Sequence, residues 1–390
     1  MSRELTREEP NYFGAGPALL PTEVLQTAAY DLLNFNSVGL GIGEISHRSG
    51  PATEVINSTK QHFKDLLDIP DTHEVFFMQG GGTSGFSSIA TNLAAAYLKK
   101  TGKPGKAGYV ITGTWSKKSY EEAVRLGVDS VVVCDAKKLN GSFGDIPSVE
   151  KWSIPDLKDT SYVYFCDNET VNGIEFPDFP FEKFPDVEIV ADMSSNILSK
   201  KLDISKYGLI MAGAQKNVGL AGISIYIIKK SLLEQPSDAE IKAAGIPLPP
   251  IAFHYPTVVA NNSAYNTIPI FTLHIVDLVL QSLLKKGGIT FQQELNEKKA
   301  KLLYETLDAY PTIFNLPVAK AVRSKMNVVF TLKDTSLDSE FLKQGEANKL
   351  TGLKGHRSVG GMRASLYNAV SLKSVELLVA YIKTFAESHK

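Results

Sequence analysis

The sequence predicts an α/β protein whose mainly parallel β-sheet is covered by helices on both faces. Short, continuous apolar runs recur from about residue 75 to residue 230, and helical stretches follow the first two of them. Such runs are typical of strands that are buried on both faces of a parallel sheet. The predicted strands are EVFFM (74–78), AGYVITG (107–113), SVVVCD (130–135), SYVYFC (161–166), VEIVADM (187–193), YGLIMAGA (207–214) and ISIYIIKK (223–230), and the helical stretches are 87–100 and 117–127.

The pattern changes near residue 270, which predicts a separate and smaller α+β domain. Residues 274–288 and 291–310 have helical patterns, the second polar enough to lie on a surface, and residues 326–332 predict a strand. A C-terminal docking helix is predicted by apolar residues at helical spacing, namely Val375, Leu378, Ile382 and Phe385. We therefore predict an N-terminal segment (1–16), a large domain (17–270) and a small C-terminal domain (271–390).

The composition is that of an ordinary globular protein, with 390 residues of which 43% are hydrophobic and 21% are charged. The formal net charge of -1 provides no basic field for nucleic acid or an anionic membrane, so neither partner is expected. No apolar run reaches the roughly 18 residues of a transmembrane helix, and the charged start MSRELTREEP predicts no signal peptide. Cys134 and Cys166 lie in apolar runs and favour a reducing compartment, and the scattered histidines predict no metal site. We therefore expect a cytoplasmic protein.

A glycine-rich loop, QGGGTSGF, follows the first predicted strand and opens a helix. Gly80, Gly82 and Gly85 match G-x-G-x-x-G, a pattern typical of phosphate binding at a helix N-terminus but also of a tight turn without a ligand. A dinucleotide site would need an acidic residue at the end of the next strand, which instead continues into Thr114 and Trp115. The loop and the aromatic residue together indicate a flat, phosphorylated cofactor with Trp115 stacked on its ring.

Two further strand ends carry groups that suit such a cofactor. Asp192 ends a buried run, where a carboxylate is either a helix cap or a ligand contact, and Lys216 follows the next run within AGAQKN. A lysine can form a Schiff base with an aldehyde, and a carboxylate can keep a pyridine nitrogen protonated so that the ring accepts electrons. We expect Gly213, Ala214 and Gly219 to leave room for the cofactor. A single lysine is usually a surface charge, but the four features together predict pyridoxal phosphate.

Motifs along the chain resemble the phosphoserine aminotransferase family from about residue 11 to the C-terminus. They are YFGAGP, SHRS, GGGTSGF, TGTWS, NETVNGIE, ADMSS, AGAQKN, NNSAYNTIP and GLKGHRSVGGMRASLYNA. The resemblance implies a fold-type-I, pyridoxal-phosphate-dependent transaminase that works as a homodimer. It also implies the transfer of the amino group of L-glutamate to 3-phosphohydroxypyruvate, which gives O-phospho-L-serine and 2-oxoglutarate in serine biosynthesis. The cofactor would carry the amino group between the two half-reactions as pyridoxamine phosphate.

The resemblance also implies roles for single residues at the matching motif positions. Lys216 would bind the cofactor as a Schiff base and act as general base, Asp192 would pair with the ring nitrogen, and Trp115 would stack on the ring. The other cofactor contacts would be Gly82, Thr83 and Gln215 at the phosphate, Thr170 near the ring hydroxyl, and Asn266 and Thr267 reaching the phosphate of the partner subunit. Bacterial family members often have Arg or Cys where this chain has Thr83, so this side chain adds no charge to the loop.

Both implied substrates are anionic at two ends, so their site needs separated cations, preferably arginines. The segments SHRS and GHRSVGGMR supply histidine beside arginine, although taken alone they are typical of a helix cap and a solvated turn. The resemblance implies that Arg48, beside His47, contacts glutamate, and that His356, Arg357 and Arg363 bind the substrate anions. Which arginine binds phosphate and which binds carboxylate stays open.

Other functions remain as alternatives. A cysteine desulfurase on the same fold needs a nucleophilic cysteine in its C-terminal half, and this chain has none after Cys166. An alanine-type transaminase would not need the additional arginine and histidine pairs. A nicotinamide-dependent dehydrogenase lacks its strand-end acid, and a non-catalytic scaffold would not need both Lys216 and Asp192.

Overall fold

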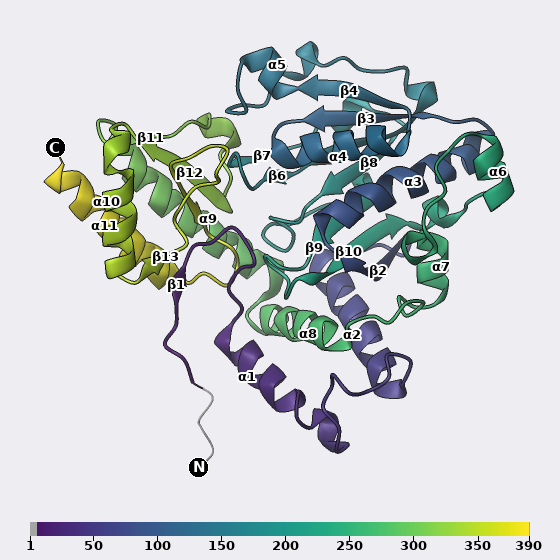
Figure 1. Ribbon diagram of the computed structural model, residues 1–390, viewed down its shortest axis with the longest axis horizontal. Coiled ribbons are helices and arrows are strands. Elements are labelled where there is room, and N and C mark those ends of the chain that lie inside the picture. Colours follow the sequence, from purple (N-terminus) through teal and green to yellow (C-terminus); the bar gives the residue numbers. More distant parts are fainter. Residues whose placement is uncertain (1–5, 390) are drawn as a thin grey trace.

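A seven-stranded sheet forms the centre of the larger part of the chain in the computed structural model, which describes residues 6–389 (Figure 1). The strands lie in the order β2-β10-β9-β8-β5-β3-β4; β10 is antiparallel to both of its neighbours, β2 and β9, and the other neighbouring pairs are parallel. They are β2 (His73–Gly80), β3 (Lys106–Ile111), β4 (Ser130–Asp135), β5 (Thr160–Cys166), β8 (Glu188–Asp192), β9 (Leu209–Gly213) and β10 (Gly222–Lys229). The predicted α/β class with a mainly parallel sheet is confirmed.

Helices cover both faces of this sheet, which explains its continuous apolar strands. Alternate residues of β2 point to opposite faces: Phe77 packs in the core beneath α2 (Gly50–Leu67) and α8 (Ile270–Lys285), and Phe76 packs beneath α3 (Gly82–Thr101). α4 (Thr114–Leu126), α6 (Asp238–Ala243) and α7 (Tyr255–Ala260) lie on the α3 side, and α5 (Ala136–Asn140) follows β4. Burial on both faces makes the sheet a rigid support for groups at its edge.

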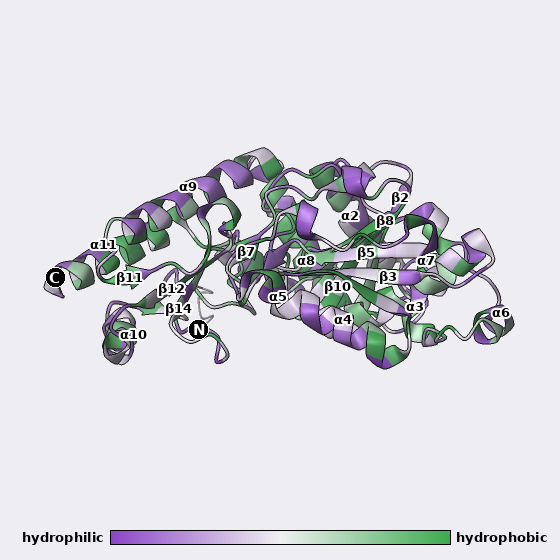
Figure 2. Cartoon of the chain, turned by 90° about the horizontal axis from the view of Figure 1, so that it is seen from above, coloured by the Kyte–Doolittle hydropathy of each residue, from purple (hydrophilic) through white to green (hydrophobic). Residues whose placement is uncertain are grey.

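The C-terminal part of the chain forms a second layer beside the large sheet. The antiparallel strands β11 (Phe314–Asn315), β12 (Asn327–Leu332) and β14 (Met362–Ser365) share a core with α9 (Gly288–Asp308), α10 (Asp338–Ala347) and α11 (Leu372–Ser388). The four apolar residues that predicted the C-terminal helix are all buried in this core. α9 shows long hydrophilic stretches in Figure 2, in agreement with its predicted surface position. No helix within residues 6–389 is long and apolar enough to cross a membrane.

Two segments connect these parts. α8 packs mainly on α2 and adds Leu273 and Leu280 to the core of the large sheet. β1 (Asn11–Tyr12) pairs in parallel with β13 (Leu350–Thr351), and α1 (Thr22–Asp31) then packs on α8. Residues 1–5 of the predicted N-terminal segment lie outside the described residues. The predicted domain boundaries at residues 16 and 270 stay a prediction.

Candidate active site

A cavity of about 520 Å³ lies where the carboxyl ends of several parallel strands meet the C-terminal part of the chain. This is the edge at which open α/β sheets bind ligands. Nine of the predicted site residues line it: Gly82, Thr83, Trp115, Thr170, Asp192, Gln215, Lys216, His356 and Arg363. Residues from six separate segments of the chain therefore surround one space.

Lys216 follows β9 and is half-buried at the cavity wall. Its Nζ atom donates a hydrogen bond to Oγ1 of Thr170 over 2.6 Å. Gly16 lies against the lysine side chain, and a Cβ atom there would come within 3.3 Å of Cγ of Lys216. Because Gly16 also has a φ of +121°, glycine suits this position in both backbone conformation and space. The amine is thus held by a neutral hydroxyl group.

Asp192 ends β8 and is only 4% exposed. Its Oδ1 atom accepts hydrogen bonds from the backbone N–H and the hydroxyl of Ser194 (2.9 and 2.6 Å), and Tyr164 donates to Oδ2 over 3.4 Å. Burial raises the pKa of Asp192, and the Ser194 hydrogen bonds and the charge of Lys216 oppose that shift. Asp192 lines the cavity and caps no helix, which favours the ligand-contact interpretation.

The glycine loop forms the N-terminus of α3. Gly80 has a φ of +138°, and a Cβ atom there would lie 2.0 Å from Oγ of Ser84, so the turn requires glycine. Gly81 caps the helix without a side chain, and Gly82 and Thr83 of the first turn line the cavity. First-turn N–H groups with the helix dipole behind them form an anion site. Gly85 has a packing role, since a Cβ atom there would meet the side chain of Met211 at 2.7 Å.

Trp115 stands at the start of α4 and forms one wall of the cavity. Its Nε1 atom is buried and has no hydrogen-bond partner among residues 6–389. Nζ of Lys118 lies 4.7 Å from the centroid of the indole ring, a cation–π contact. The indole is therefore held by packing, by this cation and by its own backbone.

Two of the predicted substrate-binding residues reach the cavity from the C-terminal part of the chain. Arg363, on β14, donates from Nη1 to the carbonyl oxygen of Thr170 over 3.2 Å. His356 lines the same cavity, and burial together with the charges of Arg363, Arg357 and Lys118 lowers its pKa. Arg357 is exposed and lies outside the cavity lining.

Four further predicted residues are not part of the lining of this cavity. Arg48, Asn266 and Thr267 are exposed, and His47 is half-buried. Arg48 donates to the carbonyl oxygen of Tyr265 over 3.3 Å, so the two predicted segments lie next to each other. None of the four contributes to the lining of the cavity in its own chain.

Gly213, Ala214 and Gly219 were expected to leave room for the cofactor, but none of the three lines the cavity. Ala214 is fully buried in the core, and a Cβ atom on Gly219 would meet Val276 of α8 at 2.8 Å. At Gly213 it would meet the side chain of Gln215 at 2.7 Å. Close packing of α8 against this loop accounts for Gly219.

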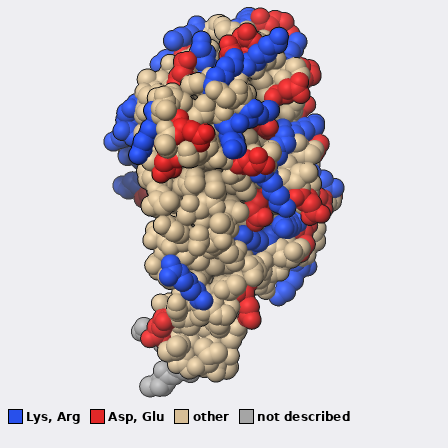
Figure 3. All heavy atoms as spheres, turned by 90° about the vertical axis from the view of Figure 1, so that its right-hand side faces the viewer, with Lys and Arg blue, Asp and Glu red and all other residues tan. Residues whose placement is uncertain are grey.

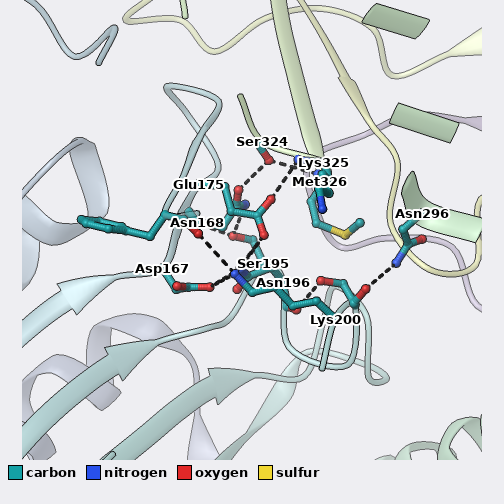
Figure 4. A network of polar contacts seen from close by, with 12 residues as sticks. Asp167, Asn168, Glu175, Ser195, Asn196, Lys200, Asn296, Ser324, Lys325 and Met326 are labelled. Atoms are coloured by element: carbon teal, nitrogen blue, oxygen red, sulfur yellow. Dashed lines mark hydrogen bonds and ion pairs between the residues drawn. The ribbon is translucent and has the colours of Figure 1, made fainter. Parts of the chain in front are cut away.

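Sequence reasoning missed several polar residues beneath the cavity. Asn168 and Ser195 line it and hydrogen-bond to each other, with Nδ2 of Asn168 2.7 Å from Oγ of Ser195 (Figure 4). Asn168 also bonds Ser324 (2.5 Å) and Asn327 (2.8 Å) in the C-terminal part. Glu169, fully buried beside Asn168, holds the start of α4. Asn168 and Glu169 belong to the motif NETVNGIE and Ser195 to ADMSS, so their only sequence signal was the family resemblance that these motifs carried.

Comparison with known families defines the class of protein. Residues 11–378 match the class-V aminotransferase family, to which a half-buried lysine beside a buried carboxylate and an open helix N-terminus is well suited. The chain is a pyridoxal-phosphate-dependent aminotransferase of fold type I.

Similarity to individual proteins identifies the family within this class. A phosphoserine aminotransferase from Saccharomyces cerevisiae is 62% identical, over 99% of this chain and 99% of its own. The solved phosphoserine aminotransferase of Bacillus circulans subsp. alkalophilus has a TM-score of 0.88 at 36% identity and covers 98% of this chain and 99% of its own. That of Trichomonas vaginalis, with pyridoxal phosphate bound, has a TM-score of 0.86 at 36% identity, over 97% and 100%. The chain belongs to the phosphoserine aminotransferase family, which confirms the predicted family, enzyme class and cofactor.

Proposed function

We propose that this chain transfers the amino group of L-glutamate to 3-phosphohydroxypyruvate and so forms O-phospho-L-serine and 2-oxoglutarate in serine biosynthesis. The observation that carries the proposal is one cavity that combines Lys216 and Asp192 with the imidazole of His356 and the cation Arg363. The relatives named phosphoserine aminotransferase support it over their whole length. The free and buried thiols of Cys134 and Cys166 suit the cytoplasm as its compartment.

The residues of the cavity fit pyridoxal phosphate, which when bound supplies an aldehyde and an electron-accepting ring. The open first turn of α3 suits the phosphate, with Gly82, Thr83 and Gln215 around it. Asp192 is placed to hold a proton on the ring nitrogen, because Ser194 and Tyr164 donate to its carboxylate and favour the ionised form. Trp115 supplies a flat wall for stacking.

Lys216 is the residue we assign to covalent binding and to proton transfer. Its Nζ atom would take the proton from Cα of glutamate and return a proton to the keto carbon of the second substrate. Thr170 orients the amine by accepting its hydrogen bond at 2.6 Å. Arg363 bonds the backbone oxygen of Thr170, so a substrate anion held by Arg363 lies next to the residue that positions the amine. Substrate binding by Arg363 and proton transfer by Lys216 are thereby linked through Thr170.

Two copies of the chain complete the site in this proposal. His47 and Arg48 lie beside the segment that carries Asn266 and Thr267, and none of the four lines its own cavity, as is expected of residues that serve a partner subunit. Asn266 and Thr267 would reach the partner's cofactor phosphate, and Arg48, beside His47, would add a cation to the partner's substrate site. Exposed apolar side chains accompany them, including Leu33, which is 79% exposed. Apolar surface of this kind marks protein interfaces.

The visible absorption of the purified holoenzyme tests this function. We expect the band of the bound cofactor to be lost when glutamate is added and to return when 3-phosphohydroxypyruvate follows. Lys216→Ala should lose this response, and Lys206→Ala, at an exposed lysine that precedes β9, should keep it. A cofactor band that ignores glutamate in the unmutated enzyme would exclude the proposed amino donor.

A further inference from the structure

Two helices at the cavity begin in the same way. α3 and α4 each follow a strand, each has a glycine cap (Gly81 and Gly113), and each has a serine three residues later (Ser84 and Ser116). In both, the serine hydroxyl accepts a hydrogen bond from the N–H of the glycine, over 3.0 and 3.2 Å. Both helix ends therefore have first-turn N–H groups without an acceptor inside the helix and a positive dipole end, the features that attract an anion.

The two helix ends differ in what meets their N–H groups. At α4, Trp115 and Ser116 donate their backbone N–H groups to the carboxylate of Glu169, each over 2.9 Å, and Thr114 donates to Asn172 over 3.1 Å. At α3, no residue in the range 6–389 supplies a side-chain acceptor to the corresponding N–H groups of residues 82–84. The N-terminus of α4 is thus occupied by the carboxylate of Glu169, whereas the N-terminus of α3 is open to the cavity.

Glu169 is built into the start of α4. It is fully buried on the short strand β6 (Asn168–Glu169), more than 50 residues further along the chain, and it also accepts a hydrogen bond from the hydroxyl of Ser116 over 2.5 Å. A Cβ atom on Gly113 would lie 2.4 Å from the carboxyl carbon of Glu169, so any larger residue at position 113 would displace the carboxylate. Gly113, Ser116 and Glu169 therefore depend on one another structurally at the start of α4.

The same contacts fix the position of Trp115. Its N–H bonds Oε2 of Glu169, whereas its indole N–H has no partner within residues 6–389. Glu169 is followed by Thr170, whose hydroxyl accepts the hydrogen bond from Lys216. The ring wall of the cavity and the hydroxyl that orients the amine are therefore held by neighbouring residues.

We infer that Glu169 is a positioning residue that serves as the internal anion of α4 and holds Trp115 at the cavity wall. The N-terminus of α3 has no such internal acceptor and is therefore the helix end that binds the cofactor phosphate. This inference rests on the proposed function, because it takes the cavity to be the site of pyridoxal phosphate. Glu169 acts through Trp115 and needs no contact with cofactor or substrate.

The test compares cofactor-free proteins in a Trp152→Phe background, where Trp115 is the one tryptophan left of the two in the sequence. Glu169→Ala should change the fluorescence of Trp115 and weaken binding of pyridoxal phosphate about tenfold or more, since hydrogen bonds to a charged group are lost. Sodium formate should restore much of the fluorescence and the affinity, because a small carboxylate can occupy the space that is left. Glu121→Ala removes an exposed carboxylate from the same helix and should change neither property.

Glu169→Gln serves as the second variant, and it decides the test if the alanine variant does not fold. Its amide nitrogen cannot accept from Trp115 or Ser116, so we expect weaker cofactor binding and an altered Trp115 signal without a change in side-chain volume. Affinity equal to that of the parent protein in both variants, or a loss that formate does not reduce in Glu169→Ala, would overturn the inference. Failure of the parent protein itself to bind pyridoxal phosphate would instead overturn the proposed function.

Discussion

Asp192 shows how a single catalytic group is held at a cost to stability. It is 4% exposed, and burial raises its pKa, so the folded protein binds a proton at this carboxylate more tightly than the unfolded chain does. A raised carboxylate pKa contributes stability at low pH that is lost as the pH rises through the folded-state value. At neutral pH the charge of Asp192 therefore destabilises the cofactor-free protein.

Asp192→Asn should consequently stabilise the cofactor-free protein while reducing amino transfer to background. Asparagine can keep the hydrogen bonds from Ser194 at Oδ1 and donate to Tyr164 from the other atom, so the gain should be about 1 kcal/mol at neutral pH. Urea unfolding and the two half-reactions measure both effects. Asp178→Asn, at an exposed position, should change neither, and a destabilised Asp192→Asn protein would contradict the argument.

His356 should act as a neutral hydrogen-bonding group and not as a cation. Burial and the charges of Arg363, Arg357 and Lys118 lower its pKa below the ordinary value, so the imidazole is uncharged at neutral pH and gains a proton only under more acidic conditions. His356→Gln should therefore change KM for 3-phosphohydroxypyruvate less than about threefold at neutral pH. Arg363→Gln should raise KM by about 10- to 100-fold, since a charged hydrogen bond is lost. Equal increases for the two variants would show that His356 is charged.

At the residue scale, the sequence predicted the groups that stand directly at strand ends. Asp192, Lys216 and Trp115 were found because carboxyl ends of parallel strands gather at one edge, whatever the connections between them. Glu169 was not found, since its role depends on a contact with Trp115 and Ser116, residues more than 50 positions away. No local pattern carries that information.

The hairpin of β6 and β7 (Ile174–Glu175) is the element that joins the cavity to the C-terminal part of the chain. Beneath it, Nζ of Lys200 lies 2.8 Å from Asp167 and 3.2 Å from Glu175, and Asn196 bonds both carboxylates (Figure 4). Glu175 also accepts the backbone N–H of Lys325 over 2.9 Å. The two carboxylates hold the pKa of Lys200 above its ordinary value despite burial.

Lys200→Met should lower the free energy of unfolding by about 3–5 kcal/mol, because it leaves two buried carboxylates without a cation. Lys201→Met, at the exposed neighbouring lysine, is the matched control and should change stability by less than about 0.5 kcal/mol. Urea unfolding at neutral pH measures both. The loss of unfolding free energy in Lys200→Met should become smaller as the pH falls and the carboxylates take up protons. A loss that does not depend on pH would show that lost packing is the cause.

Helices and strands could be predicted from the spacing of apolar residues along the sequence, but the elements against which each one packs could not. The helical pattern of residues 274–288 was recognised, and α8 covers Ile270–Lys285. Buried residues such as Leu273, Val276 and Leu280 explain its apolar run, but they pack against α2 and the large sheet. A helix that is apolar on several faces does not reveal from its sequence which core it joins.

At the scale of the whole molecule, one end of the surface has few charges. Figure 3 shows this end in the lower half of the molecule, where α1 and the chain that follows it lie in Figure 1. Its exposed apolar side chains include Tyr30, Leu33, Val38 and Leu40, and Tyr265 lies beside Arg48. An apolar surface next to residues assigned to a partner's site supports the proposed homodimer.

Leu33→Asp should therefore dissociate the dimer, because it places a charge in the apolar surface that a partner would cover. Light scattering after size-exclusion chromatography should give the 42.5 kDa mass of one chain for this variant and twice that mass for the parent protein. The monomer should also bind pyridoxal phosphate more weakly, since Asn266 and Thr267 no longer reach a neighbouring cofactor. Val124→Asp makes the same change at an exposed position on α4 and should remain dimeric with unchanged affinity. A Leu33→Asp protein that stays dimeric would place the interface elsewhere, and a monomer with full cofactor affinity would remove Asn266 and Thr267 from the site.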